Sequence, residues 1–228
     1  CVVDETARIQ QAARRIVWGK FVNAGQTCIA PDYLLVHKSK VNELTQAMAK
    51  EIKKSFGEDP QKSFSYGRII NKKHFLYLKE KIEDTKVVHG GTTNEEDLYI
   101  EPTLIKQPDL DSAIMKEENF GPILPILSYE NEEEIKPIIS RYEKPLGFYV
   151  FSKRKSFIKK MQTEYSFGGG VSNDTMIQFS NDELPFGGVG HSGVGAYHGK
   201  YSFDTFTHYK PFVKKSLLID LPTRYAPY

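Results

Sequence analysis

The chain has 228 residues, of which 39% are hydrophobic and 26% are charged. This composition is typical of a globular protein that buries a substantial core. The formal net charge is only +2, which gives no electrostatic footprint for nucleic acid or an anionic membrane, and the apolar runs are too short to span a bilayer.

The first half of the chain predicts helices and one short strand. A polar loop that contains glycine ends at Cys28, and a strand is expected from Tyr33 to Val36. The helical pattern of Val41 to Phe56 stops where Gly57 can cap it, and Asn71 begins a further helix. An earlier helix is expected from apolar residues at helical spacing, which are Ile9, Ala12, Ala13, Ile16 and Val17.

Strands and helices alternate in the second half. Strands are expected at Val87 to His89, Tyr99 to Ile105, Ile123 to Tyr129 and Leu146 to Phe151, with helices at Glu132 to Arg141 and Ser156 to Gln162. Gly168 to Gly170 then leads into Val171 and Ser172. The alternation predicts an α/β fold, with a mainly parallel twisted sheet flanked by helices.

The chain divides by character near residue 199. We expect residues 1–199 to form one α/β domain that bears Cys28. Residues 200–228 carry aromatic residues spaced by polar ones, and they are expected to form an extended C-terminal segment. Such a segment can serve as an oligomerisation arm, or it can pack as a terminal strand on its own domain.

Only two cysteines occur, Cys1 and Cys28. So few cysteines build neither a disulfide framework nor a zinc knuckle, and they fit a reducing, cytoplasmic location. The six histidines have no metal-binding spacing, so no metal site is expected.

The context of Cys28 alone leaves its role open. Gly25 lets the backbone approach closely, and Asn23, Gln26 and Thr27 surround the thiol with polar groups. The alternative is a buried structural cysteine, since free cysteine is among the most buried residue types. A thiol hydrolase would need a histidine partner, and none of the six sits in a recognisable signature.

Residues Gly188 to Gly193 match the pattern G-x-G-x-x-G. A dinucleotide fingerprint requires a buried strand before this pattern and a helix after it. Asn181 to Phe186 is not a buried strand, and Val194 to Gly199 has no helix face. We therefore interpret the segment as a glycine-rich turn that lets the chain pass close to something, such as an active site.

Several motifs in order resemble the aldehyde dehydrogenase superfamily, specifically its class 3 and fatty-aldehyde branch. The resemblance runs from Cys1 to about Lys215. It is carried by the cysteine motif Phe21 to Tyr33, by Glu117 to Pro122, by Leu184 to Gly193, and by the class 3 segments Tyr66 to Asn71 and Gly195 to Gly199. Asn119 departs from the family pattern, which has an apolar residue there.

The resemblance implies NAD(P)-dependent oxidation of an aldehyde to a carboxylic acid. The Cys28 thiolate would add to the aldehyde carbon, and the backbone N–H of Cys28 and an upstream Asn would hold the oxyanion. Hydride would pass to the nicotinamide of NAD or NADP, and a Glu would activate the water that hydrolyses the thioester.

The resemblance also assigns roles to six other residues. Glu118 would bind the nicotinamide ribose, Phe120 would lie near the nicotinamide ring, His74 would reach the cofactor, and Trp18, Phe179 and Phe186 would line the aldehyde pocket. The alternatives are a solvated surface charge for Glu118 and ordinary packing for Phe120 and Trp18. Asn173 is interpreted as structural.

In the family, the general-base Glu lies in an ELGGK-type motif just before the segment that begins here at Cys1. The oxyanion Asn and the N-terminal cofactor-binding domain lie further upstream. We therefore expect the chain to be a fragment that lacks these parts and is inactive alone, taken from a homodimer that oxidises a hydrophobic or aromatic aldehyde. The competing hypotheses are a thiol-dependent hydrolase or acyltransferase without nicotinamide, and a non-catalytic structural relative.

Overall fold

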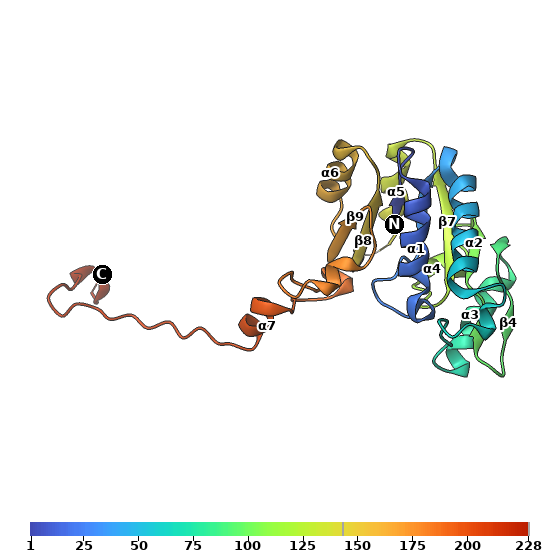
Figure 1. The fold of residues 1–228 in the computed structure, drawn as a ribbon. Coiled ribbons are helices and arrows are strands. Elements are labelled where there is room, and N and C mark those ends of the chain that lie inside the picture. The colour runs from blue at the N-terminus through green and yellow to red at the C-terminus, as the bar shows by residue number, and fades with distance from the viewer. Residues whose placement is uncertain (143, 228) are drawn as a thin grey trace.

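A seven-stranded sheet runs through the middle of the computed structural model, which describes residues 1–142 and 144–227 (Figure 1). The strand order is β3-β6-β7-β2-β1-β8-β9, and every neighbouring pair is parallel except β3 with β6. The strands are β1 (Val2–Val3), β2 (Leu34–His37), β3 (Val87–His89), β6 (Thr103–Lys106), β7 (Ile123–Tyr129), β8 (Gly147–Phe151) and β9 (Gly169–Ser172). The mainly parallel sheet that the sequence predicts is confirmed.

Helices cover both faces of this sheet. One face packs against α1 (Ile9–Phe21) and α2 (Val41–Phe56). The other face packs against α3 (Lys72–Glu83), α4 (Ala113–Lys116), α5 (Ile135–Ile139) and α6 (Lys155–Glu164). Because successive side chains of a strand point to opposite faces, β1 sends Val3 into the first core and Val2 into the second. A sheet covered on both sides needs strands that are almost wholly apolar, as β7 is.

The predicted starts and ends of two helices are confirmed by their caps. The side chain of Asn71 accepts a hydrogen bond of 2.9 Å from the backbone N–H of His74, which satisfies a free donor in the first turn of α3. Helix α2 ends at Gly57, whose φ of +84° favours glycine and whose N–H donates to the Lys53 carbonyl at 2.9 Å.

Two predicted elements are divided in the structure. The expected strand from Tyr99 to Ile105 splits at Pro102, which lacks an N–H. Its first part, β5 (Tyr99–Ile100), forms a hairpin with β4 (Thr93–Asn94), and its second part is β6. The expected helix from Glu132 to Arg141 is a 3₁₀ turn (Glu132–Glu134) followed by α5.

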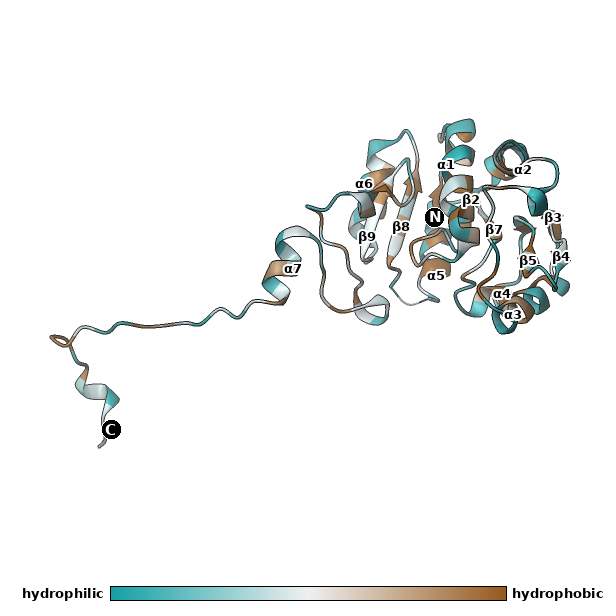
Figure 2. Cartoon of the chain, turned by 60° about the horizontal axis from the view of Figure 1, so that its bottom comes forward, coloured by the Kyte–Doolittle hydropathy of each residue, from teal (hydrophilic) through white to brown (hydrophobic). Residues whose placement is uncertain are grey.

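The prediction of an extended segment from residue 200 is wrong for its first part. Residues Gly199–Thr205 form helix α7. Lys200 and Asp204, one turn apart, form an ion pair, and the Ser202 hydroxyl accepts a hydrogen bond of 2.9 Å from the His198 N–H at the start of this helix. Residues 206–221 form neither helix nor strand, and this hydrophobic-rich tail lies apart from the body (Figure 2).

Polar side chains meet where β1, β8 and β9 end. Asp4, only 1% exposed, accepts hydrogen bonds from Thr6 and Ser152 hydroxyls, each at 2.6 Å, and from the Arg154 guanidinium at 2.7 Å. Asn173 bonds both backbone groups of Ser152 at 2.9 Å, so its predicted structural role is confirmed. We call Asp4, Thr6, Ser152 and Arg154 the carboxyl-end cluster, because it lies at the carboxyl ends of these parallel strands.

Among the described residues, no helix combines the length and the apolar character that crossing a membrane requires.

Candidate functional site

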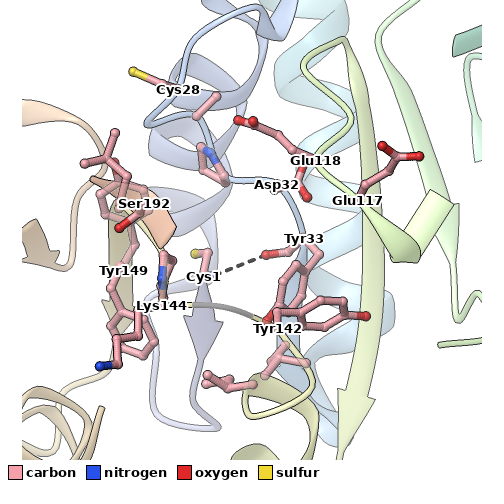
Figure 3. A pocket seen from close by; sticks show the side chains of 18 of the residues that line it. Cys1, Cys28, Asp32, Tyr33, Glu117, Glu118, Tyr142, Lys144, Tyr149 and Ser192 are labelled. Carbon is pink, nitrogen blue, oxygen red and sulfur yellow. Dashed lines mark hydrogen bonds between the residues drawn. The ribbon is translucent and has the colours of Figure 1, made fainter. Parts of the chain in front are cut away.

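A pocket of about 520 Å³ opens at the opposite edge, where β1, β2 and β8 begin. Cys28, Asp32, Glu118 and Ser192 are among the residues that line it (Figure 3). In Figure 3 Glu118 extends toward the side of the pocket where Cys28 lies, while Glu117 points the other way. The pocket therefore brings together Cys28 of the cysteine motif and Glu118 of the motif Glu117 to Pro122.

The loop before Cys28 is a left-handed turn. Asn23, Ala24 and Gly25 have φ values of +54°, +51° and +73°. Such values cost a non-glycine residue about 1–2 kcal/mol each, so neighbouring contacts must hold the turn. The turn reverses the chain after α1 and leaves Cys28 exposed. The alternative of a buried structural cysteine is therefore wrong.

Gln26 holds this turn against a distant segment. Its side-chain amide donates to the carbonyls of Asn23 at 3.2 Å and Arg68 at 2.9 Å, and its side-chain oxygen accepts from the N–H of Ile70 at 2.9 Å. Asn23 in turn donates to the Gln26 carbonyl at 2.8 Å. The motif Tyr66 to Asn71 thus supports the cysteine loop, a role that its sequence did not predict.

Gly25 also lets the cysteine loop touch the loop of Glu118. A Cβ atom on Gly25 would overlap the backbone carbonyl of Gly121. The two motif loops carry Cys28 and Glu118, which are 90 residues apart in the sequence. Their backbones can therefore touch only because residue 25 has no side chain.

We expect Gly25→Ala to lower the free energy of unfolding by about 2 kcal/mol or more, because a strained φ and a backbone overlap act together. Displacement of the Cys28 loop should slow reactions of the thiol about 100-fold. Urea unfolding and alkylation kinetics measure the two effects. Gly195→Ala is the control, since Gly195 has a φ of +79° with open space beside it. Equal effects of the two substitutions would contradict the close-contact explanation.

Two charges near Glu118 shift its pKa in opposite directions. Partial burial raises the pKa of Glu118, the Asp32 carboxylate raises it further, and the Lys20 ammonium lowers it. Lys20 itself lies in the last turn of α1 and is 1% exposed. Burial lowers the pKa of Lys20, and the carboxylates of Asp32 and Glu118 oppose that shift. This buried cation has no signal in the sequence, because Lys is rarely buried.

His74 and Phe120 lie together beside Glu118. A ring nitrogen of His74 is 2.8 Å from the carbonyl oxygen of Phe120, and the two rings are 6.5 Å apart at their centroids. Phe120 has a φ of +49° and keeps 38% of its surface exposed. The Phe120 ring therefore remains partly exposed, and ordinary packing in the core does not account for it.

The structure brings together two of the three residues that the resemblance placed in the aldehyde pocket. The rings of Phe179 and Phe186 meet edge to face, with centroids 5.1 Å apart. His198, which the sequence reasoning missed, stacks on Phe186 at 5.8 Å and tilts against Phe179 at 5.4 Å. Trp18 lies on α1 with half of its surface exposed, and no ring contact joins it to this group among the described residues.

The segment Gly188 to Gly193 is a glycine-rich turn, as predicted. Gly190–Ser192 is a 3₁₀ turn, and a Cβ atom on Gly188 would overlap the carbonyl of Ser192. His191 and Ser192 line the same pocket as Cys28. Within residues 1–142 and 144–227, no three His, Cys, Asp or Glu side chains are grouped in a way that could hold a metal ion.

A protein-family comparison matches residues 1–212 with the family described as the aldehyde dehydrogenase family. The 4,4'-diaponeurosporen-aldehyde dehydrogenase of Staphylococcus aureus is 48% identical over 229 residues, which cover 100% of this chain and 50% of that protein. The dimeric NADP-preferring aldehyde dehydrogenase of Rattus norvegicus is 48% identical over 218 residues, covering 96% and 48%. The chain thus spans about half the length of these curated relatives.

Solved structures agree in fold. Staphylococcus aureus AldH in a substrate-bound state superposes with a TM-score of 0.93 and 48% identity, covering 100% of this chain and 50% of that one. A Methanocaldococcus jannaschii glyceraldehyde-3-phosphate dehydrogenase complexed with NADP gives a TM-score of 0.79 and 27% identity, covering 89% and 45%.

Proposed function

Because this chain belongs to the aldehyde dehydrogenase family, we propose that it supplies the cysteine-bearing part of an NAD(P)-dependent oxidation of an aldehyde to a carboxylic acid. The observation that carries this proposal is the exposed Cys28 at a pocket that it shares with Glu118. An exposed thiol held by a strained, bonded turn suits a nucleophile better than a structural residue.

Cys28 acts first. Its thiolate attacks the carbonyl carbon, a C–S bond forms, and the carbonyl π electrons move to oxygen to give a tetrahedral adduct. The backbone N–H of Cys28 donates to the developing oxyanion. The nicotinamide cofactor, when bound, supplies the acceptor for the hydride that leaves the adduct carbon. The acyl group then remains on Cys28 as a thioester until water releases the acid.

Glu118, together with Phe120 and His74 beside it, offers groups that suit a nicotinamide riboside. The Glu118 carboxylate can accept hydrogen bonds from ribose hydroxyls, and its position at the pocket with Cys28 supports this role. Phe120 offers an apolar surface for the nicotinamide ring, and His74 fixes the Phe120 carbonyl. For a hydrophobic or aromatic aldehyde, the paired rings of Phe179 and Phe186 would provide one apolar wall, and the half-exposed Trp18 of α1 would provide another. We also propose a homodimer in which the tail after α7 takes part.

An activated ester tests this proposal on the chain itself. With 4-nitrophenyl acetate we expect a burst of about one nitrophenolate per chain, with the acetyl group found on Cys28 by mass spectrometry. We expect these 228 residues alone to show no sustained ester turnover. We also expect them to form no NADH from NAD and a medium-chain aldehyde. Sustained ester hydrolysis without nicotinamide would instead support the hydrolase hypothesis, and absence of acylation would support a non-catalytic relative.

A further inference from the structure

Asn119 is a fully buried polar side chain next to Glu118, with 0% of its surface exposed. The motif that this segment resembles has an apolar residue at the same position. A buried amide without partners costs about 1–3 kcal/mol. Its presence here therefore requires a set of hydrogen bonds that an apolar residue would not make.

The structure supplies these bonds from three directions. The backbone N–H of Asn119 donates to the Asp32 carboxylate at 3.1 Å, and the side-chain amide donates to the Ile114 carbonyl at 3.1 Å and to Asp32 at a longer 3.5 Å. The side-chain oxygen accepts from the Lys81 ammonium at 3.3 Å. Both donors and the acceptor of the amide are thus used.

The Asp32 carboxylate acts electrostatically on two buried lysines, Lys20 and Lys81. Lys81 of α3 is 5% exposed and lies 4.4 Å from the centre of the Tyr77 ring, and Lys20 of α1 is 1% exposed. Burial lowers the pKa of both ammonium groups, and Asp32 is among the carboxylates that oppose this shift. The loop of Glu118 is therefore tied through Asn119 to Lys81 of α3 and to Asp32.

We propose that Asn119 is a positioning residue: its hydrogen bonds to Asp32, Ile114 and Lys81 fix the loop from Glu117 to Phe120, so that Glu118 faces the Cys28 side of the pocket. The inference rests on the proposed function, because it takes Glu118 as the group that binds the ribose of the cofactor. An apolar residue would fill the space but would give the loop no directional bonds. Lys81 also reaches the Glu117 carbonyl at 3.5 Å, which holds the other side of Glu118.

Asn119→Leu tests this role with two measurements that need neither aldehyde nor cofactor. We expect the backbone amides of residues 118–121 to exchange hydrogen at least about 10-fold faster, while those of α2 keep their rates. In an NMR titration of the Glu118 carboxyl, we expect the pKa to fall toward its ordinary value, because the loop moves away from burial and from Asp32. The other charge that acts on this carboxyl, the Lys20 ammonium, is unchanged in the variant.

Asn42→Leu is the matched control. Asn42 also accepts a hydrogen bond from a lysine, Lys106 at 3.0 Å, but it is exposed on α2 and lies outside the pocket. It should change neither the exchange of residues 118–121 nor the titration of Glu118. Equal behaviour of the Asn119 and Asn42 variants would overturn the inference.

Two further variants test the same role if Asn119→Leu does not fold. Asn119→Asp places two carboxylates side by side and should loosen the loop more than Asn119→Leu does. Adding Asp32→Asn to this variant again pairs an amide with a carboxylate. It should restore at least half of the lost protection of residues 118–121 against hydrogen exchange. No restoration would overturn the positioning role. Neither result bears on acylation of Cys28, so an unreactive thiol would refute the proposed function separately.

Discussion

Replacing Cys28 by alanine is expected to lower the covalent capture of esters and aldehydes at least about 1,000-fold. The reason is that the proposed chemistry forms a bond to this sulfur, which is the exposed one of the two thiols in the pocket. Mass spectrometry after treatment with an activated ester measures the capture.

Cys1→Ala is the matched control for that experiment. Cys1 lines the same pocket, but it is half-buried, and its terminal nitrogen donates to the Tyr33 carbonyl at 3.1 Å (Figure 3). The Cys1 variant should keep at least half of the reactivity. If the Cys28 variant still carried the acyl label, or if both variants lost it equally, the assignment of the nucleophile would be wrong.

Asp4→Ala is expected to lower the free energy of unfolding by about 3 kcal/mol, since removal of one member of a buried ion pair strands its partners. Arg154 would keep its ion pair with Glu132, at 3.0 Å, but would lose the pair with Asp4, and the hydroxyls of Thr6 and Ser152 would lose the Asp4 carboxylate as acceptor. For a chain of this length the melting temperature should fall by roughly 6–12 °C. Asp59→Ala, which breaks the exposed pair with Lys62, is the control and should leave the melting temperature unchanged.

The stability that Asp4 provides should depend on pH. Burial raises the pKa of Asp4, but hydrogen bonds from Arg154, Ser152 and Thr6 outweigh burial and lower it from 3.8 to about 2. Since the folded pKa lies below the unfolded one, the contribution is complete above about pH 4 and is lost as the pH falls through 2. Urea unfolding of wild type and Asp4→Ala should therefore converge between pH 4 and 2. A constant difference across this range would contradict the explanation.

The sequence predicted the elements whose pattern is long and clearly terminated. Val41 to Phe56 repeats apolar residues at helical spacing and ends at a glycine, and Ile123 to Tyr129 is almost wholly apolar, so both ranges match the structure. Helix α7 was missed because Gly199–Thr205 has no buried residue to create such a pattern. Its ion pair and its serine cap act locally and leave little trace in hydropathy.

For the site, the sequence identified the motifs but not the contacts between them. Gln26 binds Arg68 and Ile70 across more than forty positions of the chain, and only the folded backbone shows which carbonyl and which N–H it meets. Asn119 was noted only as a departure from a pattern. Its meaning depends on Asp32 and Lys81, which come from two other elements and give no local signal.

The carboxyl-end cluster and the Cys28 pocket lie at opposite ends of the same parallel strands. Effects of substitutions at distant sites without shared partners usually add. Substitutions that raise thermal stability at the carboxyl-end cluster can therefore be selected separately from substitutions that change substrate preference at the Cys28 pocket. The best variants of each kind can then be combined in one protein.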